Sequence, residues 1–246
     1  MCTTCGCSGG QTISATPNTE KTYHHHEHEH NSRLLEVEQN LLSKNNHYAE
    51  LNRQRLSSTK TIAFNLVSSP GSGKTSILTT TINELKSRFS VAVIEGDQQT
   101  DQDAKRIRET GAKAVQINTG KGCHLDAHAV GHALEEIDLK QSDFVMIENV
   151  GNLVCPAAFD LGEKAKVVVL SVTEGEDKPL KYPDMFHASS LMLINKMDLL
   201  PYVDFNLDQC IEYARRIKPN IEVICLSAKT GEGLDEWLNW LSSQRI

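Results

Sequence analysis

The segment Ser68–Thr75 (SSPGSGKT) has the residue types and the spacing that phosphate binding requires. Its glycines let backbone N–H groups turn toward phosphate oxygens, Lys74 would neutralise the β- and γ-phosphates, and the Thr75 hydroxyl would bind Mg²⁺. The usual motif begins with Gly where this chain has Ser68, and we interpret this as a tolerated variation rather than as an ordinary glycine-rich turn. The expected phosphate contacts are Gly71, Ser72, Gly73, Lys74, Thr75 and Ser76.

Acidic residues follow two other apolar stretches that predict strands. Asp97 ends the sequence EGD, and Glu148 begins the sequence ENVG. Because ligands of open α/β sheets gather at the carboxyl ends of strands, we interpret Asp97 as a Mg²⁺ contact, direct or through water. Lys74 and Glu148, the latter beside the γ-phosphate, are the expected catalytic residues. Acidic residues that merely end strands are the alternative.

The sequence Asn195–Asp198 (NKMD) predicts selection of guanine over adenine. Asp198 can accept hydrogen bonds from the guanine ring N–H and amino group, and adenine would leave this carboxylate unpaired. Asn195 would brace the loop, and the Lys196 stem would cover the base. A further strand end would offer a backbone N–H to the guanine carbonyl, through Ser227, Ala228 and Lys229. With the phosphate loop, these motifs predict a GTPase domain.

Hydrolysis by this domain is expected to be slow. Signalling GTPases carry a Gln that orients the attacking water, and the corresponding stretch here, Glu148–Asn152, contains none. Most of the catalysis of phosphoryl transfer comes from positioning of the reacting groups. The absence of this Gln therefore predicts a slow hydrolase, which suits a switch better than a motor.

Three cysteines near the start of the chain form a candidate metal site. Cys2, Cys5 and Cys7 lie within six residues, and thiolates are common metal ligands. With the terminal amine as a fourth ligand, a planar site would suit Ni²⁺. Tetrahedral zinc remains the competing interpretation. The histidine-rich tract at positions 24–30 (HHHEHEH) is a second candidate, for weak buffering of several nickel ions.

A third thiol set lies inside the predicted GTPase domain. Cys123 and His124 follow the sequence TGKG, and Cys155 comes four residues after Gly151. Both loops are expected near the nucleotide, where they would bind Zn²⁺ or Ni²⁺ within one subunit or between two. Two partly buried loop cysteines without a metal are the alternative.

Four more residues continue this pattern less clearly. His128 and His132 follow His124 at helical spacing and could flank its site, although a solvated helix face is the more usual origin of such spacing. Cys210 and Cys225 fall in a predicted helix and strand, and we interpret both as core residues.

The elements that would position these residues alternate between apolar strands and amphipathic helices after position 60. This predicts an α/β P-loop GTPase fold with a mainly parallel sheet covered by helices on both faces. The expected strands are Ile62–Ser68, Val91–Glu95, Phe144–Glu148, Lys166–Val172, Leu191–Asn195 and Val223–Ser227. The expected helices are Lys74–Phe89, Leu125–Ile137, Leu207–Ile217 and Leu234–Ser243.

Composition divides the chain into three segments. Positions 1–33 hold three Cys and five His among residues that bury little, which predicts a flexible metal-binding tail. Positions 34–59 predict one or two amphipathic helices, and positions 60–246 form the GTPase domain. The net charge of −7 argues against binding to nucleic acid or an anionic membrane. No apolar run reaches the roughly 20 residues of a membrane span, and no secretory signal is visible, so reduced thiols and a cytoplasmic location are expected.

Together these motifs resemble the HypB family of hydrogenase nickel-incorporation GTPases. The likeness covers nearly the whole chain through CxxCGC, SSPGSGKT, EGDQQTD, GKGCHLDA, ENVGNLVCP, SVTEGEDKPLKYP and NKMD. It implies a P-loop protein that delivers nickel to the large-subunit precursor of [NiFe]-hydrogenase under control of GTP hydrolysis. Implied partners are a second copy of the chain upon nucleotide or metal binding, a HypA-type nickel metallochaperone and, in some bacteria, a SlyD-type prolyl isomerase.

The resemblance also implies site assignments. High-affinity nickel binding falls on Cys2, Cys5 and Cys7, and a zinc or nickel site falls on Cys123, His124 and Cys155. Nucleotide roles fall on Lys74, Thr75, Asp97, Asn195 and Asp198. A urease-type nickel GTPase and a nickel storage protein with a vestigial GTPase domain are the alternative functions.

Overall fold

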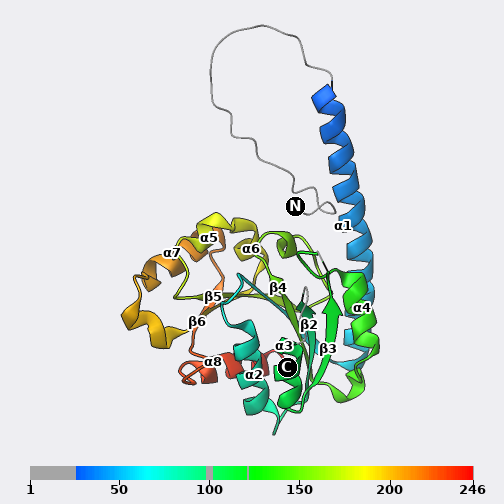
Figure 1. The fold of residues 1–246 in the computed structure, drawn as a ribbon. Coiled ribbons are helices and arrows are strands. Elements are labelled where there is room, and N and C mark those ends of the chain that lie inside the picture. Colours follow the sequence, from blue (N-terminus) through cyan, green and yellow to red (C-terminus); the bar gives the residue numbers. More distant parts are fainter. Residues whose placement is uncertain (1–25, 98–101, 121, 246) are drawn as a thin grey trace, which may run out of the picture.

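The computed structural model describes residues 26–97, 102–120 and 122–245. Within these ranges the core is a seven-stranded sheet in the order β3-β2-β4-β1-β5-β6-β7, with parallel pairing at every step (Figure 1). Parallel strands need crossover connections, which the intervening helices supply. The strands are β1 (Ile62–Ser68), β2 (Val91–Asp97), β3 (Lys113–Asn118), β4 (Phe144–Gly151), β5 (Ala165–Ser171), β6 (Leu191–Asn195) and β7 (Glu222–Cys225).

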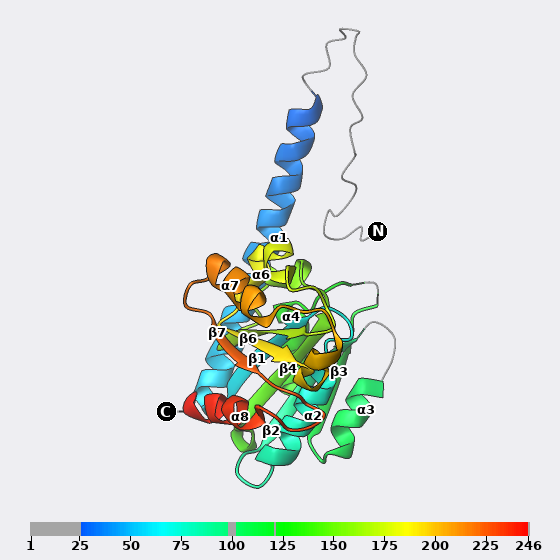
Figure 2. The ribbon, with the colours of Figure 1, turned by 90° about the vertical axis from the view of Figure 1, so that its left-hand side faces the viewer.

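Helices cover both faces of this sheet, because alternate residues of each strand point to opposite sides. On β5, Val167 and Val169 face one core together with α2 and α8, whereas Val168 and Leu170 face another core with α6 and α7 (Figure 2). The helices are α1 (His26–Thr59), α2 (Lys74–Leu85), α3 (Gln102–Glu109), α4 (Ala127–Glu135), α5 (Lys178–Lys181), α6 (Pro183–Ala188), α7 (Leu207–Ile217) and α8 (Leu234–Ser243). Short 3₁₀ turns lie at Leu139–Gln141, Cys155–Ala157 and Met197–Tyr202.

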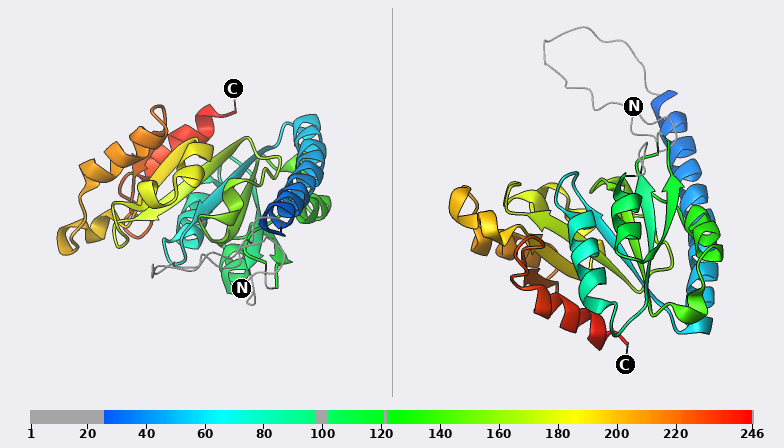
Figure 3. Two further views of the ribbon diagram at one scale, coloured as in Figure 1. Left: turned by 90° about the horizontal axis from the view of Figure 1, so that it is seen from above. Right: turned by 60° about the horizontal axis from the view of Figure 1, so that its bottom comes forward.

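The long helix α1 lies alongside α4, and its first turns extend beyond the sheet (Figures 1 and 3). Its C-terminal half packs on the domain: Leu56 joins the core that α4 forms with β2 and β4. Asn52 donates hydrogen bonds to the carbonyl oxygens of Ala127 (2.7 Å) and Leu161 (3.0 Å). The sequence predicted one or two helices over positions 34–59. The structure has a single helix that begins earlier, at His26.

The predicted fold class is confirmed, and each expected strand and helix has a counterpart. The bounds of β1, β6, α7 and α8 are as expected, and those of the others are shifted. The first expected helix stops at Leu85 rather than Phe89. Sequence reasoning missed β3 and α3, together with the short helices α5 and α6. In the described part of the chain, no helix is long and apolar enough to cross a membrane.

Candidate functional site

The phosphate loop connects β1, which lies at the centre of the sheet, to the N-terminus of α2. Gly71 (φ +77°) and Gly73 (φ +100°) both have the left-handed backbone that glycine adopts without strain. A side chain at Gly73 would also collide with the Asn195 amide. The N-terminus of α2 therefore opens onto the loop, in the arrangement that binds anions through backbone N–H groups.

Lys74 is buried at the start of α2, and its Nζ donates a hydrogen bond to Ser68 Oγ at 2.7 Å. Burial lowers the pKa of Lys74, and the charge of Glu148 acts in the opposite direction. The Ser68 hydroxyl, at the position where the usual motif has Gly, is thus the hydrogen-bond acceptor of Lys74. Ser76, also expected to contact phosphate, lies within 3.4 Å of Arg106 Nη2 from α3.

Glu148, on β4, lies directly behind Thr75. The Thr75 hydroxyl donates a 2.7 Å hydrogen bond to Glu148 Oε1. Oε2 is also buried and, among the residues that the structure describes, accepts no hydrogen bond. Burial raises the pKa of Glu148 to about 6, although Lys74 and Thr75 act in the opposite direction. A cation beside the Thr75 hydroxyl would compensate this charge.

Asp97 is the last residue of β2, where its backbone pairs with that of Asn118 on β3. The position of its side chain falls outside what the structure describes. Glu95, two residues earlier, pairs with Glu148 on the neighbouring strand β4. The two acidic stretches of the sequence therefore lie on adjacent strands.

Asn195 joins the phosphate loop to the predicted base-binding loops. At the end of β6, its Nδ2 donates to the Ser72 carbonyl (2.9 Å), and its Oδ1 accepts from the Ala228 N–H (3.1 Å). Asp198 Oδ1 accepts a 2.6 Å hydrogen bond from the Ser227 hydroxyl. These contacts bring three separate motifs into one site.

Lys196 and Lys229 lie at the rim of this site. Lys196 has a left-handed backbone (φ +64°), and its Nζ donates to the Gly71 carbonyl at 2.8 Å, so its stem crosses the mouth of the phosphate loop. Lys229 is exposed in the turn after β7. Sequence reasoning missed Lys178 of α5, whose Nζ contacts Ser69 Oγ (2.9 Å) and Glu174 Oε2 (3.1 Å).

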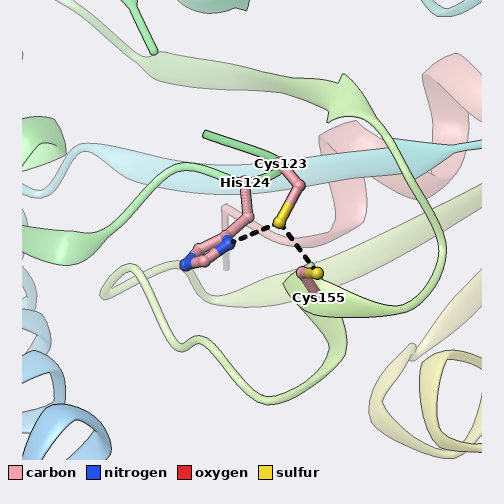
Figure 4. Close-up of side chains that lie close together, drawn as sticks. All are labelled: Cys123, His124 and Cys155. Atoms are coloured by element: carbon pink, nitrogen blue, oxygen red, sulfur yellow. Dashed lines mark hydrogen bonds between the residues drawn. The ribbon is translucent and has the colours of Figure 1, made fainter. Parts of the chain in front are cut away.

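Cys123, His124 and Cys155 come together in one cluster (Figure 4). The two sulfur atoms are 2.8 Å apart, and Cys123 Sγ lies 3.5 Å from His124 Nδ1. All three ligand atoms lie within 4.8 Å of one another, and each residue is partly exposed. Two sulfurs and one imidazole at this spacing suit Zn²⁺, Ni²⁺ or another borderline metal ion.

The surroundings hold His124 ready as a ligand. Its ring packs against Phe159 at a tilt of 38°, with 3.9 Å between the ring centroids. Burial lowers the pKa of His124, which the charge of Asp126 opposes, and this favours the neutral imidazole that binds metals.

Two asparagines that sequence reasoning did not assign to the site align its loops. Asn152 Nδ2 donates to the Cys123 carbonyl at 3.1 Å, which ties the loop after β4 to the loop after β3. Asn149 Oδ1 accepts from the Leu125 N–H at 3.2 Å. The amide-rich sequence ENVGN at a strand end was the available signal. The other predicted thiol ligands, Cys2, Cys5 and Cys7, and the start of the histidine tract lie outside the described residues.

Known proteins share much of this sequence and its fold. The "CobW/HypB/UreG, nucleotide-binding domain" family matches residues 62–225. The Hydrogenase maturation factor HypB of Azotobacter vinelandii is 65% identical over 214 residues, which span 87% of this chain and 71% of that protein. The chain belongs to the HypB family. The HypB of Escherichia coli strain K12 is 62% identical over 87% of this chain and 73% of its own length.

Two HypB crystal structures share the fold. The HypB from Archaeoglobus fulgidus has a TM-score of 0.78 at 39% identity and covers 83% of this chain and 100% of its own. The HypB from Helicobacter pylori in complex with nickel has a TM-score of 0.79 at 39% identity, over 82% of this chain and 95% of its own. The predicted family is therefore confirmed, and a nucleotide-binding domain occupies residues 62–225.

Proposed function

We propose that the chain is a cytoplasmic, GTP-hydrolysing nickel metallochaperone that helps to insert Ni²⁺ into the large-subunit precursor of [NiFe]-hydrogenase. One observation carries this proposal: Cys155, which contacts Cys123, lies in the loop that follows β4, and β4 itself carries Glu148 against the phosphate loop. The HypB relatives named hydrogenase maturation factors, and the nickel complex of one of them, support the choice of metal and recipient.

The nucleotide side of the site would bind GTP and Mg²⁺. Lys74 and the loop N–H groups would hold the phosphates, and Asp198 would select guanine. Thr75 and Asp97 would hold Mg²⁺, whose charge would neutralise the buried Glu148 carboxylate. Because the site contains no Gln at the position expected to orient water, we expect slow intrinsic hydrolysis, below about 1 per second.

The metal side of the site would bind Ni²⁺ as cargo, with Zn²⁺ as a competitor. Cys123, His124 and Cys155 supply three donors and leave further positions for water or a ligand from a partner. Such an incomplete set suits a metal that must later leave. By resemblance, Cys2, Cys5 and Cys7 would form the tighter nickel site of the tail.

Coupling between the two sides follows from their shared loop. Loss of the γ-phosphate would change the contacts of Thr75 and Glu148 and so displace the segment that leads to Cys155. Asn152 would carry this movement to Cys123. By thermodynamic linkage, the factor by which bound nucleotide changes the metal affinity equals the factor by which bound metal changes the nucleotide affinity. A second copy of the chain or a HypA-type metallochaperone would supply ligands at the coordination positions that Cys123, His124 and Cys155 leave open. A SlyD-type isomerase would assist the transfer of the metal.

The test is GTP hydrolysis with and without Ni²⁺ or Zn²⁺, in the wild type and in Cys155→Ala. We expect added metal to change the wild-type rate, and Cys155→Ala to lose that response while GTP affinity stays within about twofold. Cys225→Ala removes a thiol of similar exposure on β7 and should keep the response. Wild-type hydrolysis that ignores both metals would overturn the coupling.

A specific observation also favours urease as a recipient. The Helicobacter pylori relative, 39% identical over 86% of this chain, is named "Hydrogenase/urease maturation factor HypB". Deleting the gene and assaying hydrogenase and urease side by side separates the two recipients. The Lys74→Ala variant distinguishes nickel storage from GTP-dependent insertion. If this variant restores hydrogenase activity without added nickel, the protein stores the metal and does not insert it.

A further inference from the structure

A second group of metal-binding side chains lies on the outer face of α4. His128 and His132 are four residues apart, and their Nε2 atoms approach to 3.2 Å. His132 is exposed, with 65% of its side chain accessible. Spacing of four places both imidazoles on one helix face, one turn apart. The pair is separate from the Cys123–Cys155 cluster and takes no part in the proposed nucleotide chemistry.

The separation of the two nitrogens matches that of a chelate. Imidazole nitrogens bind Zn²⁺ and similar ions at about 2.0–2.1 Å. Two such donors at an angle of about 90–109° stand about 2.9–3.4 Å apart. The 3.2 Å separation falls within that range, so the spacing of the two nitrogens fits one shared cation.

A carboxylate behind His132 directs its lone pair toward the partner ring. Glu135 Oε2 lies 3.3 Å from His132 Nδ1, and Glu135 Oε1 accepts a 3.1 Å hydrogen bond from Arg55 of α1. The ion pair with Arg55 holds the Glu135 carboxylate beside Nδ1 of His132. When Nδ1 donates its proton to this carboxylate in a hydrogen bond, Nε2 of His132 offers its lone pair to a metal, as in the carboxylate–histidine–metal arrangement of known sites.

Helix α1 keeps the pair in place from the other side. The ring of Tyr48 lies 4.5 Å from that of His128, centroid to centroid. Asn52 binds the Ala127 carbonyl at the start of α4, and a side chain at Gly131 would collide with Asn52. Both donors therefore stand on a helix that is fixed before any ion arrives, which lowers the entropic cost of binding.

We propose that His128 and His132 form a solvent-facing chelate for a divalent transition-metal ion, Ni²⁺ or Zn²⁺, with Glu135 as the positioning residue. Among the residues that the structure describes, the pair supplies two donors, so the remaining positions are open to water and the ion exchanges readily. Since α4 begins three residues after His124, such a site would concentrate ions next to the partly exposed Cys123–Cys155 cluster. It stands independently of the proposed GTP-gated function.

The test is hydrogen–deuterium exchange with mass spectrometry on the full chain, titrated with Ni²⁺ and, separately, with Zn²⁺. Peptides that cover residues 127–135 report on α4 alone, so metal held by the tail does not enter the signal. An ion that bridges the pair suppresses opening of the helix by the factor 1 + [M]/Kd, which is roughly tenfold when free metal is ten times Kd. We expect this slowing in the wild type.

Five variants separate the explanations. His128→Gln and His132→Gln should abolish the slowing, and Glu135→Gln should move the midpoint to a severalfold higher metal concentration. Cys155→Ser and His187→Gln, which removes an exposed histidine of α6, should leave it unchanged. Slowing that survives His132→Gln, slowing that disappears with Cys155→Ser, or no slowing in the wild type would each overturn the proposal. Loss of the metal response of hydrolysis would instead bear on the proposed function alone.

Discussion

The domain contains two pairs of cysteines whose surroundings differ sharply. Cys123 and Cys155 lie in loops after β3 and β4, are partly exposed, and bring their sulfurs within 2.8 Å beside an imidazole. Cys210 lies in α7 with no exposed surface, as expected of a core residue. Cys225 lies in β7 and is partly exposed, but it packs against the same core. Burial raises the pKa of both of these thiols, that of Cys210 to about 12.

The difference shows that position in the fold, not residue type, decides what a thiol can do. A cysteine inside a helix or strand is held by the packing of that element and acts as a small apolar group. A cysteine in a loop at the carboxyl end of a parallel strand is free of that packing and meets the loops of neighbouring strands. The Cys123–Cys155 contact arises because β3 and β4 flank β2 in the sheet.

Thiol alkylation should show this contrast most strongly. With metal removed by a chelator and the thiols reduced, N-ethylmaleimide at pH 8 should modify Cys123 and Cys155 quickly. A thiol with a pKa of about 12 is ionised roughly a thousandfold less than an ordinary thiol at this pH, so Cys210 should react last by that factor or more. Peptide mass spectrometry follows each site separately. Equal rates at Cys155 and Cys210 would break the comparison.

Metal affinity should show the next largest difference between the loop cysteines and the cysteines of α7 and β7. In a background with Cys2, Cys5 and Cys7 changed to Ser, Cys155→Ser should weaken Ni²⁺ and Zn²⁺ binding roughly a hundredfold, since loss of even an outer-shell partner costs 10–100-fold. Cys225→Ser should leave the affinity within about twofold. Titration calorimetry on the two variants measures both. Removal of the metal from the parent should restore fast alkylation of Cys123 and Cys155.

The fold followed from sequence more completely than the site did. Strands such as β5 are continuous apolar runs and were visible, whereas β3 (KAVQIN) places Lys113 and Gln116 among its apolar residues and was missed. It is an edge strand in which only Ala114 and Val115 are buried, so it contains few apolar residues that could reveal it. Helix α3 is short and strongly polar, which hides it in the same way.

Site residues in contiguous motifs could be named because backbone geometry links them directly. The contacts between motifs could not. Nothing in the sequence showed that Asn195 would bond both the Ser72 carbonyl and the Ala228 N–H, or that Asn152 would reach the Cys123 carbonyl. These bonds join positions 29–123 residues apart in the chain, and only the sheet order brings them together.

The free energy of unfolding should show the smallest difference between the two cysteine pairs. Here substitution of the core cysteine should have the larger effect. Cys210→Ser places a hydroxyl in the core formed by β5, β6, α6 and α7, where burying a polar group without a full partner costs about 1–2 kcal/mol. Cys155→Ser changes a partly exposed loop residue and should cost under about 0.5 kcal/mol in the metal-free protein. Urea unfolding of both variants, with chelator present, measures the difference. If Cys155→Ser proved the more destabilising, its thiol would serve packing, and the division between loop and core cysteines would not hold.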